Sequence, residues 1–137
     1  MAKAISVLVR EIMTKSLITV KTSDKVSDAI QRMTESDVVS VIVTEDGKPV
    51  GILTERDILK RVCPEKLCTR NVTAGEIMSR PLVHIEADAG LGQASSLMTL
   101  KDVRRLLVVD KGKIVGIVTQ KDIMRGALET FMSLASI

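Results

Sequence analysis

Two threonine–aspartate pairs are the side chains of this sequence with the clearest capacity for chemistry. Thr54 and Asp57 form the first pair, and Thr119 and Asp122 form the second. An aspartate carboxylate can accept two hydrogen bonds from the 2′,3′-diol of a ribose, while a hydroxyl and free backbone N–H groups at a helix start can meet a phosphate. The same spacing also joins a helix N-cap to its third helical residue, a contact worth about 1 kcal/mol. The pairs therefore predict either a site for a phosphorylated sugar or two helix caps.

A duplication connects the two pairs. Residues 10–61 align without a gap to residues 75–126 at an offset of 65, and 18 of the 52 aligned pairs are identical, against ~3 expected by chance. Both copies contain a Glu-Ile-Met motif near their start and a Gly-Ile-x-Thr-x-x-Asp motif near their end. We therefore divide the chain as follows: a first repeat at 9–62, a connector at 63–73, a second repeat at 74–127 and an apolar tail at 128–137.

Each repeat carries the signals of a β-α-β-β-α unit. β-branched runs and turn residues predict strands at 17–20, 38–43, 49–53, 82–85, 103–109 and 114–118. Capping oxygens at 22–24 and apolar periodicity predict a helix that ends before Val38, and its counterpart covers 92–100. A further helix begins after Thr54 and another after Thr119. One such unit leaves a sheet face uncovered, so we predict an α+β fold of two repeats packed sheet to sheet with pseudo-two-fold symmetry.

The composition indicates an aliphatic core in a protein without membrane spans. Hydrophobic residues make up 45% of the 137 residues, yet the chain has no Trp, no Tyr and one Phe, Phe131. Four methionines at repeat-equivalent positions are predicted core residues: Met13, Met33, Met78 and Met98. Charged residues interrupt every apolar run, and the first residues do not resemble a secretory signal, so we expect a cytoplasmic location.

Cysteine and histidine show no catalytic or metal-binding arrangement. Cys63 and Cys68 match no strong metal or redox spacing. We expect reduced thiols, with a local disulfide as the alternative if the source is a hyperthermophile. His84 is the single histidine and lacks companions. We therefore expect no catalytic residues, no metal and no required cofactor, and a protein that is not an enzyme.

The duplicated unit, with its Gly-hydrophobic-x-Thr-x-x-Asp ending, resembles a tandem pair of CBS domains, an assembly often called a Bateman module. The resemblance covers nearly the whole chain and implies a regulatory sensor that binds AMP, ADP, ATP or an S-adenosylmethionine-like ligand in clefts between the repeats. It also implies a homodimer. A stand-alone module of this kind would act through its ligand, its dimer partner or another regulated protein.

The resemblance further implies two composite nucleotide sites, each combining the ribose pair of one repeat with apolar and phosphate contacts from the other. The first would comprise Ile52, Thr54, Asp57, Leu82, Val83, Arg104 and Arg105. The second would comprise Leu17, Ile18, Val39, Ser40, Ile117, Thr119 and Asp122. Because the second site has no arginine pair, we predict that it binds phosphate more weakly, takes a less charged adenosine derivative or stays empty.

Two alternatives remain open from the sequence. A dimerisation or scaffold module would explain the apolar tail as a partner surface or capping helix, and would leave both threonine–aspartate pairs as caps in vestigial pockets. A nucleic-acid-binding accessory protein is the other alternative. The net charge of only +3 and the lack of aromatic stacking residues beyond Phe131 argue against nucleic acid as the partner.

Overall fold

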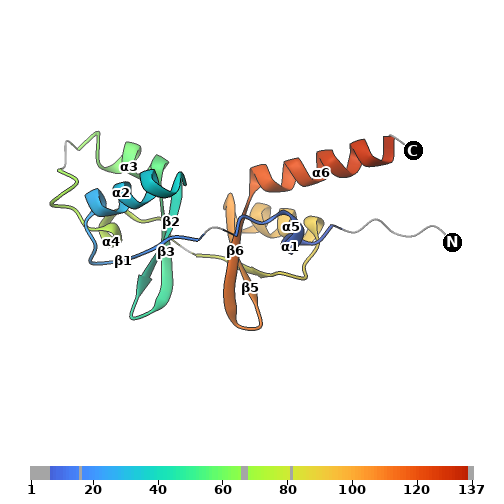
Figure 1. Ribbon diagram of the computed structural model, residues 1–137, viewed down its shortest axis with the longest axis horizontal. Helices are drawn as coiled ribbons and strands as arrows, with labels where there is room; N and C mark the ends of the chain where they lie inside the picture. The colour runs from blue at the N-terminus through green and yellow to red at the C-terminus, as the bar shows by residue number, and fades with distance from the viewer. Residues whose placement is uncertain (1–6, 16, 66–67, 81, 136–137) are drawn as a thin grey trace. The chain divides into compact units, whose positions relative to one another are not determined.

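The computed structural model describes residues 7–15, 17–65, 68–80 and 82–135, which form two compact units (Figure 1). The central unit comprises Leu17–Leu82. The terminal unit combines Met1–Ser16 with Val83–Ile137. Each unit is described separately below.

The central unit has a three-stranded sheet in the order β1-β2-β3, with its helices on one face (Figure 1). Its elements are β1 (Thr19–Lys21), α2 (Val26–Ser36), β2 (Ser40–Glu45), β3 (Lys48–Thr54), α3 (Glu55–Arg61) and α4 (Ala74–Ile77). Strands β1 and β2 are parallel, β2 and β3 are antiparallel, and the β2–β3 register shifts between Val43 and Thr44.

The terminal unit repeats this architecture with the sheet order β4-β5-β6. Its elements are α1 (Val9–Ile12), β4 (His84–Glu86), α5 (Leu91–Lys101), β5 (Arg105–Asp110), β6 (Lys113–Thr119) and α6 (Gln120–Ala135). All six predicted strands are present, with bounds shifted by no more than two residues. The predicted α+β fold of two sheet-and-helix halves is confirmed.

The Glu-Ile-Met segment of each repeat packs into the unit that carries the other repeat's sheet. Val9 and Ile12, in α1 of the first repeat, belong to the core cluster of the terminal unit. Ile77 and Met78, at α4 of the second repeat, belong to the core cluster of the central unit. Both short helices were absent from the sequence prediction. Each compact unit therefore completes its core with a segment from the other repeat.

Residues 22–24 do not cap α2, so that prediction was wrong. The N-cap of α2 is Lys25, which makes no side-chain capping bond, and Asp24 accepts a hydrogen bond from the Lys21 backbone N–H at 2.8 Å instead. Carbonyl groups of the connector accept from the first N–H groups of the helix: Val26 N to Val72 O at 2.8 Å and Ser27 N to Thr69 O at 3.0 Å. Backbone contacts from a distant segment thus replace the expected local cap.

The turn residues between the predicted strands form two hairpin turns, and the predicted end of α2 is confirmed. Gly47 and Gly112 have φ near +77°, each after a non-glycine residue that is also left-handed, which is the geometry of a tight two-residue hairpin. Asp37 ends α2 in the left-handed region and accordingly terminates the helix before Val38. These features depend on local residues alone, which is why the sequence could predict them.

The cores are aliphatic, as predicted. Met33, Met78 and Met98 are buried, and Met13 is partly buried against the core of the terminal unit. The apolar tail predicted at 128–137 is, over its described residues, a direct continuation of α6.

Glycine in each Gly-Ile motif permits the Glu-Ile-Met segment to approach the sheet closely. A Cβ at Gly116 would lie 2.8 Å from the Thr14 carbonyl oxygen and 2.7 Å from the Met13 sulfur. The backbone bonds between Thr14 and Ile117, at 2.8 and 3.0 Å, hold that carbonyl in place.

We therefore expect Gly116→Ala to lower the free energy of unfolding by about 1–3 kcal/mol, since the added methyl group overpacks a fixed backbone contact. Chemical denaturation measures this change. Gly92→Ala is the matched control, because Gly92 lies in α5 with open space around it and alanine should add about 0.5–1 kcal/mol there. A Gly116→Ala variant with an unchanged free energy of unfolding would contradict the close approach of the Thr14 carbonyl to Gly116.

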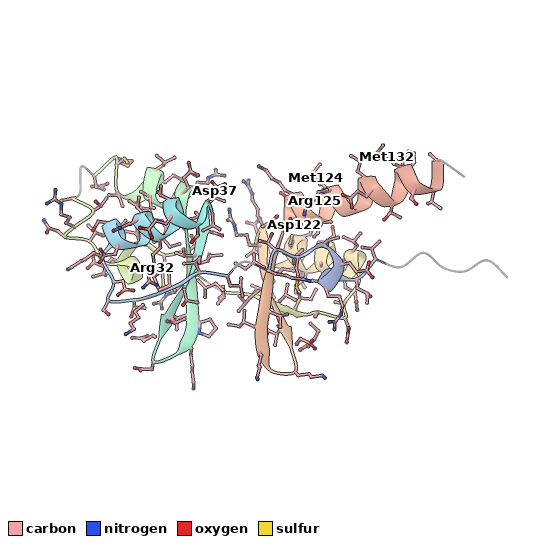
Figure 2. All side chains as sticks on the ribbon, in the orientation of Figure 1. Arg32, Asp37, Asp122, Met124, Arg125 and Met132 are labelled. Carbon is pink, nitrogen blue, oxygen red and sulfur yellow. The ribbon has the colours of Figure 1, made fainter. Side chains whose placement is uncertain are left out.

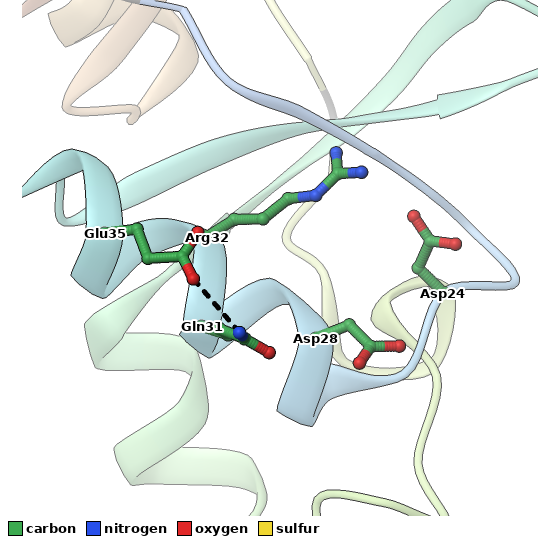
Figure 3. A pocket seen from close by; sticks show the side chains of 5 residues that line it. All are labelled: Asp24, Asp28, Gln31, Arg32 and Glu35. Carbon is green, nitrogen blue, oxygen red and sulfur yellow. Dashed lines mark hydrogen bonds between the residues drawn. The ribbon is translucent and has the colours of Figure 1, made fainter.

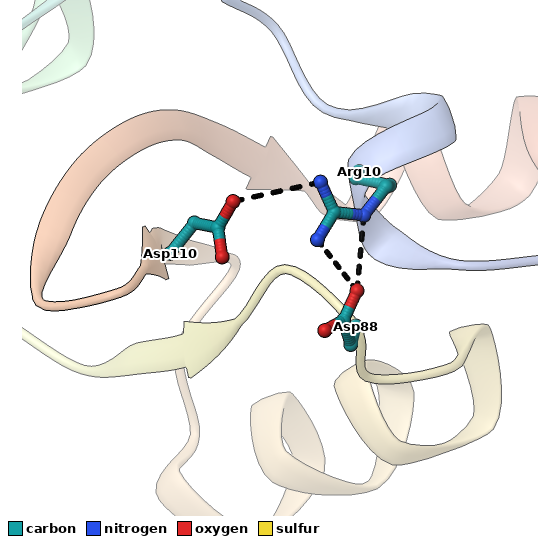
Figure 4. A network of polar contacts seen from close by, with 3 residues as sticks. All are labelled: Arg10, Asp88 and Asp110. Carbon is teal, nitrogen blue, oxygen red and sulfur yellow. Dashed lines mark hydrogen bonds and ion pairs between the residues drawn. The ribbon is translucent and has the colours of Figure 1, made fainter.

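Within the terminal unit, an ion-pair network links α1 to Asp88 and Asp110 (Figure 4). The Arg10 guanidinium donates to Asp88 from Nε at 3.0 Å, and its Nη1 lies 3.6 Å from Asp110 Oδ2. The hydrogen bond with Asp88 and the charges of both carboxylates raise the pKa of Arg10 above its ordinary value. The guanidinium therefore stays charged at any physiological pH and can pair with Asp88 and Asp110.

Candidate functional site

The first threonine–aspartate pair lies where β3 passes directly into α3. Thr54 has an extended backbone, and its Oγ1 accepts from the Asp57 N–H at 3.1 Å, while the Thr54 N–H donates to Asp57 Oδ2 at 2.9 Å. The Thr54 hydroxyl also lies 3.0 Å from Oδ2 as a donor. Only 3% of Thr54 and 8% of Asp57 are exposed. The pair is thus a buried capping box, as one of the two sequence interpretations predicted.

Ser79 contacts the other oxygen of Asp57. Its hydroxyl donates to Asp57 Oδ1 at 2.6 Å. Two backbone bonds between Ser79 and Ile52, at 2.7 and 3.2 Å, fix the serine beside β3. The Asp57 carboxylate is therefore oriented from two sides, by the start of its own helix and by the segment that follows α4.

The second pair has the same cap but a different third partner. The Thr119 N–H donates to Asp122 Oδ2 at 2.9 Å, and the Asp122 N–H donates to Thr119 Oγ1 at 3.1 Å. Asp122 is 5% exposed. Its Oδ1 accepts from Nη2 of Arg125, one turn along α6, at 2.9 Å (Figure 2). A cation thus stands where the first pair has a neutral hydroxyl.

The other predicted site residues divide between the two units. The central unit holds Ile52, Leu82, Leu17, Ile18, Val39 and Ser40, and the terminal unit holds Val83, Arg104, Arg105 and Ile117. In the sheet registers, Ser40 pairs with Thr54 and Arg105 pairs with Thr119. Within a unit, each Thr–Asp pair therefore neighbours the polar residue that the sequence assigned to the opposite site.

The residues just before β2 and β5 serve the helix starts through their backbones. The Val39 carbonyl accepts from the Glu55 N–H at 2.9 Å, and the Arg104 carbonyl accepts from the Gln120 N–H at 3.0 Å. The side chains of Val39 and Arg104 are exposed, while Ile52 and Ile117 are buried.

Sequence reasoning missed Ser79 and Arg125. The 65-residue offset pairs Ser79 with Thr14 and Arg125 with Lys60, so both positions are polar in both repeats. That shared polarity was the available signal. It could not identify the contacts, because Ser79 reaches Asp57 only after the chain has passed through the connector and α4.

A polar pocket of about 330 Å³ lies along α2, and none of the predicted site residues lines it (Figure 3). Its lining consists of Asp24, Asp28, Gln31, Arg32 and Glu35. The Arg32 guanidinium donates to the Thr19 carbonyl at 2.6 Å, and Gln31 donates to Glu35 at 3.0 Å. The single cation of the lining is therefore engaged with the backbone of β1, and the pocket carries an acidic wall.

The remaining residues of chemical interest form no cluster in the parts of the chain that the structure describes. Cys63 and Cys68 are exposed free thiols, and His84 is exposed in β4. Over residues 7–15, 17–65, 68–80 and 82–135, no group of three or more His, Cys, Asp or Glu side chains could hold a metal ion. None of the described helices has the length and apolar character needed to cross a bilayer.

Comparison with known sequences places this chain among CBS proteins. The CBS domain profile matches residues 9–63 and 74–129. A Methanopyrus kandleri protein is 38% identical over 88% of this chain and 62% of its own length. Hypoxic response protein 1 of Mycobacterium tuberculosis is 32% identical over 85% of this chain and 82% of that protein. The chain spans only 62%, 31% and 66% of three archaeal relatives.

Solved structures agree with the sequence comparison. A CBS domain protein of Thermoplasma acidophilum matches with a TM-score of 0.76 and 31% identity over 88% of this chain and 69% of that chain. A hexameric CBS-CP12 protein from bloom-forming cyanobacteria has a TM-score of 0.80 at 28% identity, covering 88% and 68%. Hypoxic Response Protein I with two coordinated zinc ions has a TM-score of 0.70 at 30% identity, covering 87% and 98%. The two matched segments and these relatives show that the chain belongs to the CBS domain family as a tandem pair of CBS domains.

Proposed function

We propose that this chain is a non-enzymatic regulatory module that binds AMP, ADP, ATP or a related adenosyl compound such as S-adenosylmethionine. The observation that carries the proposal is the buried carboxylate of Asp57, together with that of Asp122 at the equivalent position of the second repeat. A cap contributes only about 1 kcal/mol, whereas a buried carboxylate is costly unless hydrogen bonds or opposite charges compensate its desolvation. A ligand contact gives both carboxylates a reason to be buried in addition to capping.

The chemistry at Asp57 suits a ribose diol. The hydrogen bonds described for its two oxygens come from Thr54 and Ser79, which are neutral donors. A carboxylate oxygen has two lone-pair sites, so a diol can add to these bonds or replace the Ser79 hydroxyl. Arg104 and Arg105 remain the predicted phosphate contacts, on the sequence resemblance alone.

Thermal unfolding in the presence of a ligand panel tests this function. A ligand that binds only the folded chain should stabilise it by about 2.7 kcal/mol at 100 times its Kd. We expect a raised midpoint with at least one of AMP, ADP, ATP and S-adenosylmethionine, and none with an equimolar ribose-free control such as pyrophosphate. No shift with any adenosyl compound would favour the scaffold alternative. A nucleic-acid ligand would instead show affinity that falls steeply with salt.

We also propose that a second copy of this chain packs on α6. Met124, Leu128 and Met132 are 69%, 58% and 61% exposed and follow one another every four residues along α6. Figure 2 labels the two methionines at the ends of this row. The row reads the same in both directions about Leu128, so an antiparallel copy places Leu128 opposite itself and each methionine opposite the other. Two-fold interfaces require this self-complementarity, and the hexameric CBS-CP12 relative is consistent with self-association in the family.

Leu128→Glu should therefore weaken self-association by at least about 100-fold, because it places two unpaired carboxylates at the two-fold axis. Sedimentation velocity over a range of concentrations measures the change. Leu100→Glu is the matched control, since Leu100 is 79% exposed on α5 outside this row. A monomeric native chain, or a Leu128→Glu variant that dimerises normally, would contradict the proposed surface.

A further inference from the structure

We infer that Arg125 restricts access of a ribose diol to Asp122, so that the two threonine–aspartate pairs have unequal affinities and the pair containing Asp57 fills first. Arg125 is thus a specificity-determining residue of the terminal unit. This inference rests on the proposed function and adds to it a difference between two sites that the duplicated motif makes appear equal.

The geometry at Asp122 is that of a closed contact. Arg125 lies three residues after Asp122 on α6, and its Nη2 donates to Oδ1 at 2.9 Å. The aspartate side chain is 7% exposed and the arginine side chain is 59% exposed. Asp122 and Arg125 both lie in α6, which continues for ten residues beyond Arg125 to Ala135. The regular helix therefore keeps the two side chains on the same face.

The central unit lacks this contact. Lys60 occupies the position equivalent to Arg125, in the last turn of the seven-residue helix α3, and makes no ion pair among the described residues. Asp57 Oδ1 accepts instead from Ser79. The equivalent of Ser79 is Thr14, whose described hydrogen bonds are backbone bonds to Ile117. The Oδ1 atom of the buried carboxylate therefore accepts from a different residue in each unit, from Ser79 in the central unit and from Arg125 in the terminal unit.

The nature of the donor decides how readily a ligand can replace it. The Ser79 hydroxyl is a neutral donor to the Asp57 carboxylate, and a ribose hydroxyl can replace that hydrogen bond one for one. The Arg125 guanidinium is a charged donor, so its contact with Asp122 is an ion pair as well as a hydrogen bond, and a neutral diol cannot restore the lost charge pairing. Since the arginine is largely exposed, solvent screening reduces this difference, and we expect a penalty of about tenfold in affinity.

The alternative role for Arg125 is to assist binding through an anionic group of the ligand. In that case the arginine would swing from Asp122 to a phosphate, and its removal would weaken binding. The two roles predict opposite changes in affinity, so a single substitution distinguishes them.

The test is isothermal titration of the full chain with ATP and with AMP, using Asp57→Ala to isolate the terminal unit. We expect Asp57→Ala/Arg125→Ala to bind about tenfold more tightly than Asp57→Ala alone. Asp57→Ala/Glu129→Ala is the matched control, because it removes another exposed charge of α6, and it should bind as Asp57→Ala does. Circular dichroism checks that each variant is folded.

A reciprocal variant keeps the inference independent of any fold defect at position 125. In the Asp122→Ala background, Lys60→Arg introduces the equivalent arginine beside Asp57 and should weaken binding by a similar factor. If the unsubstituted chain binds the nucleotide but Asp57→Ala/Arg125→Ala binds no more tightly than Asp57→Ala, the inference alone is overturned. Absence of binding by the parent chain and by every variant would overturn the proposed function and the inference together.

Discussion

Replacing Asp57 with alanine is expected to lower the affinity of the tighter adenosyl site by about 100-fold or more. The carboxylate would offer two hydrogen bonds to the ribose diol, and hydrogen bonds to charged groups contribute about 1.5–3 kcal/mol each. Because Asp57 is buried with its oxygens oriented by Thr54 and Ser79, no neighbouring group can take over its role without rearrangement. Isothermal titration measures the loss directly.

Controls separate this binding effect from a folding effect. Asp57→Ala also removes the capping contact, which should cost about 1 kcal/mol of stability. Glu45→Ala, at the exposed end of β2, should change neither property. If Asp57→Ala binds as tightly as the native chain, the carboxylate is only a cap and the proposed site is wrong.

Replacing Ile12 with alanine is expected to destabilise the sheet of the second repeat, although Ile12 belongs to the first. The side chain is 7% exposed and packs in the core cluster that includes Leu106, Val108 and Val118. Truncating a buried isoleucine to alanine lowers the free energy of unfolding by about 2–5 kcal/mol. Chemical denaturation should show this loss of free energy of unfolding.

The location of the effect is the more informative result. Amide chemical shifts in the native variant should change most in α5, β5 and β6, and least in β2 and β3. Glu11→Ala, at the exposed neighbouring residue of α1, is the matched control and should change stability by less than about 0.5 kcal/mol. Shift changes centred on Val41 and Leu53 would contradict the assignment of α1 to the terminal unit.

Local features of this fold could be predicted from its sequence because local residues determine them. The β-branched runs predict every strand. The two hairpin turns contain Asp-Gly and Lys-Gly. Both capping boxes follow from a threonine and an aspartate three residues apart. The continuous α6 is also local in origin. No proline and no glycine interrupt residues 127–135, so the helix that begins after Thr119 continues to Ala135, the last described residue of the predicted tail.

Features that depend on distant segments could not be predicted in this way. The gapless duplication suggested that each repeat forms its own unit, but a repeat alignment cannot reveal that the Glu-Ile-Met segments exchange between units. The same exchange brings Ser79 to Asp57 and connector carbonyls to the start of α2. Arg125 was missed for another reason: an arginine on an exposed helix face is common, and only the 2.9 Å contact distinguishes it.

The two threonine–aspartate pairs illustrate the limit for function. Their capping role is established by the hydrogen bonds in both units. A ligand role does not exclude capping, because the same carboxylate can hold a backbone N–H with one oxygen and a ribose hydroxyl with the other. Ligand titration therefore decides between sensor and scaffold.

The most direct test is a paired titration of the nucleotide-stripped chain with AMP and with 2′-deoxy-AMP. We predict saturable binding of AMP and at least about tenfold weaker binding of the deoxy compound. The deoxy compound lacks one of the two hydroxyls that would donate a hydrogen bond to Asp57. If AMP does not bind, the same pair is run with ATP. Equal affinity for the ribose and deoxyribose forms, or no binding of either nucleotide, would contradict a sensor that recognises the ribose diol through Asp57.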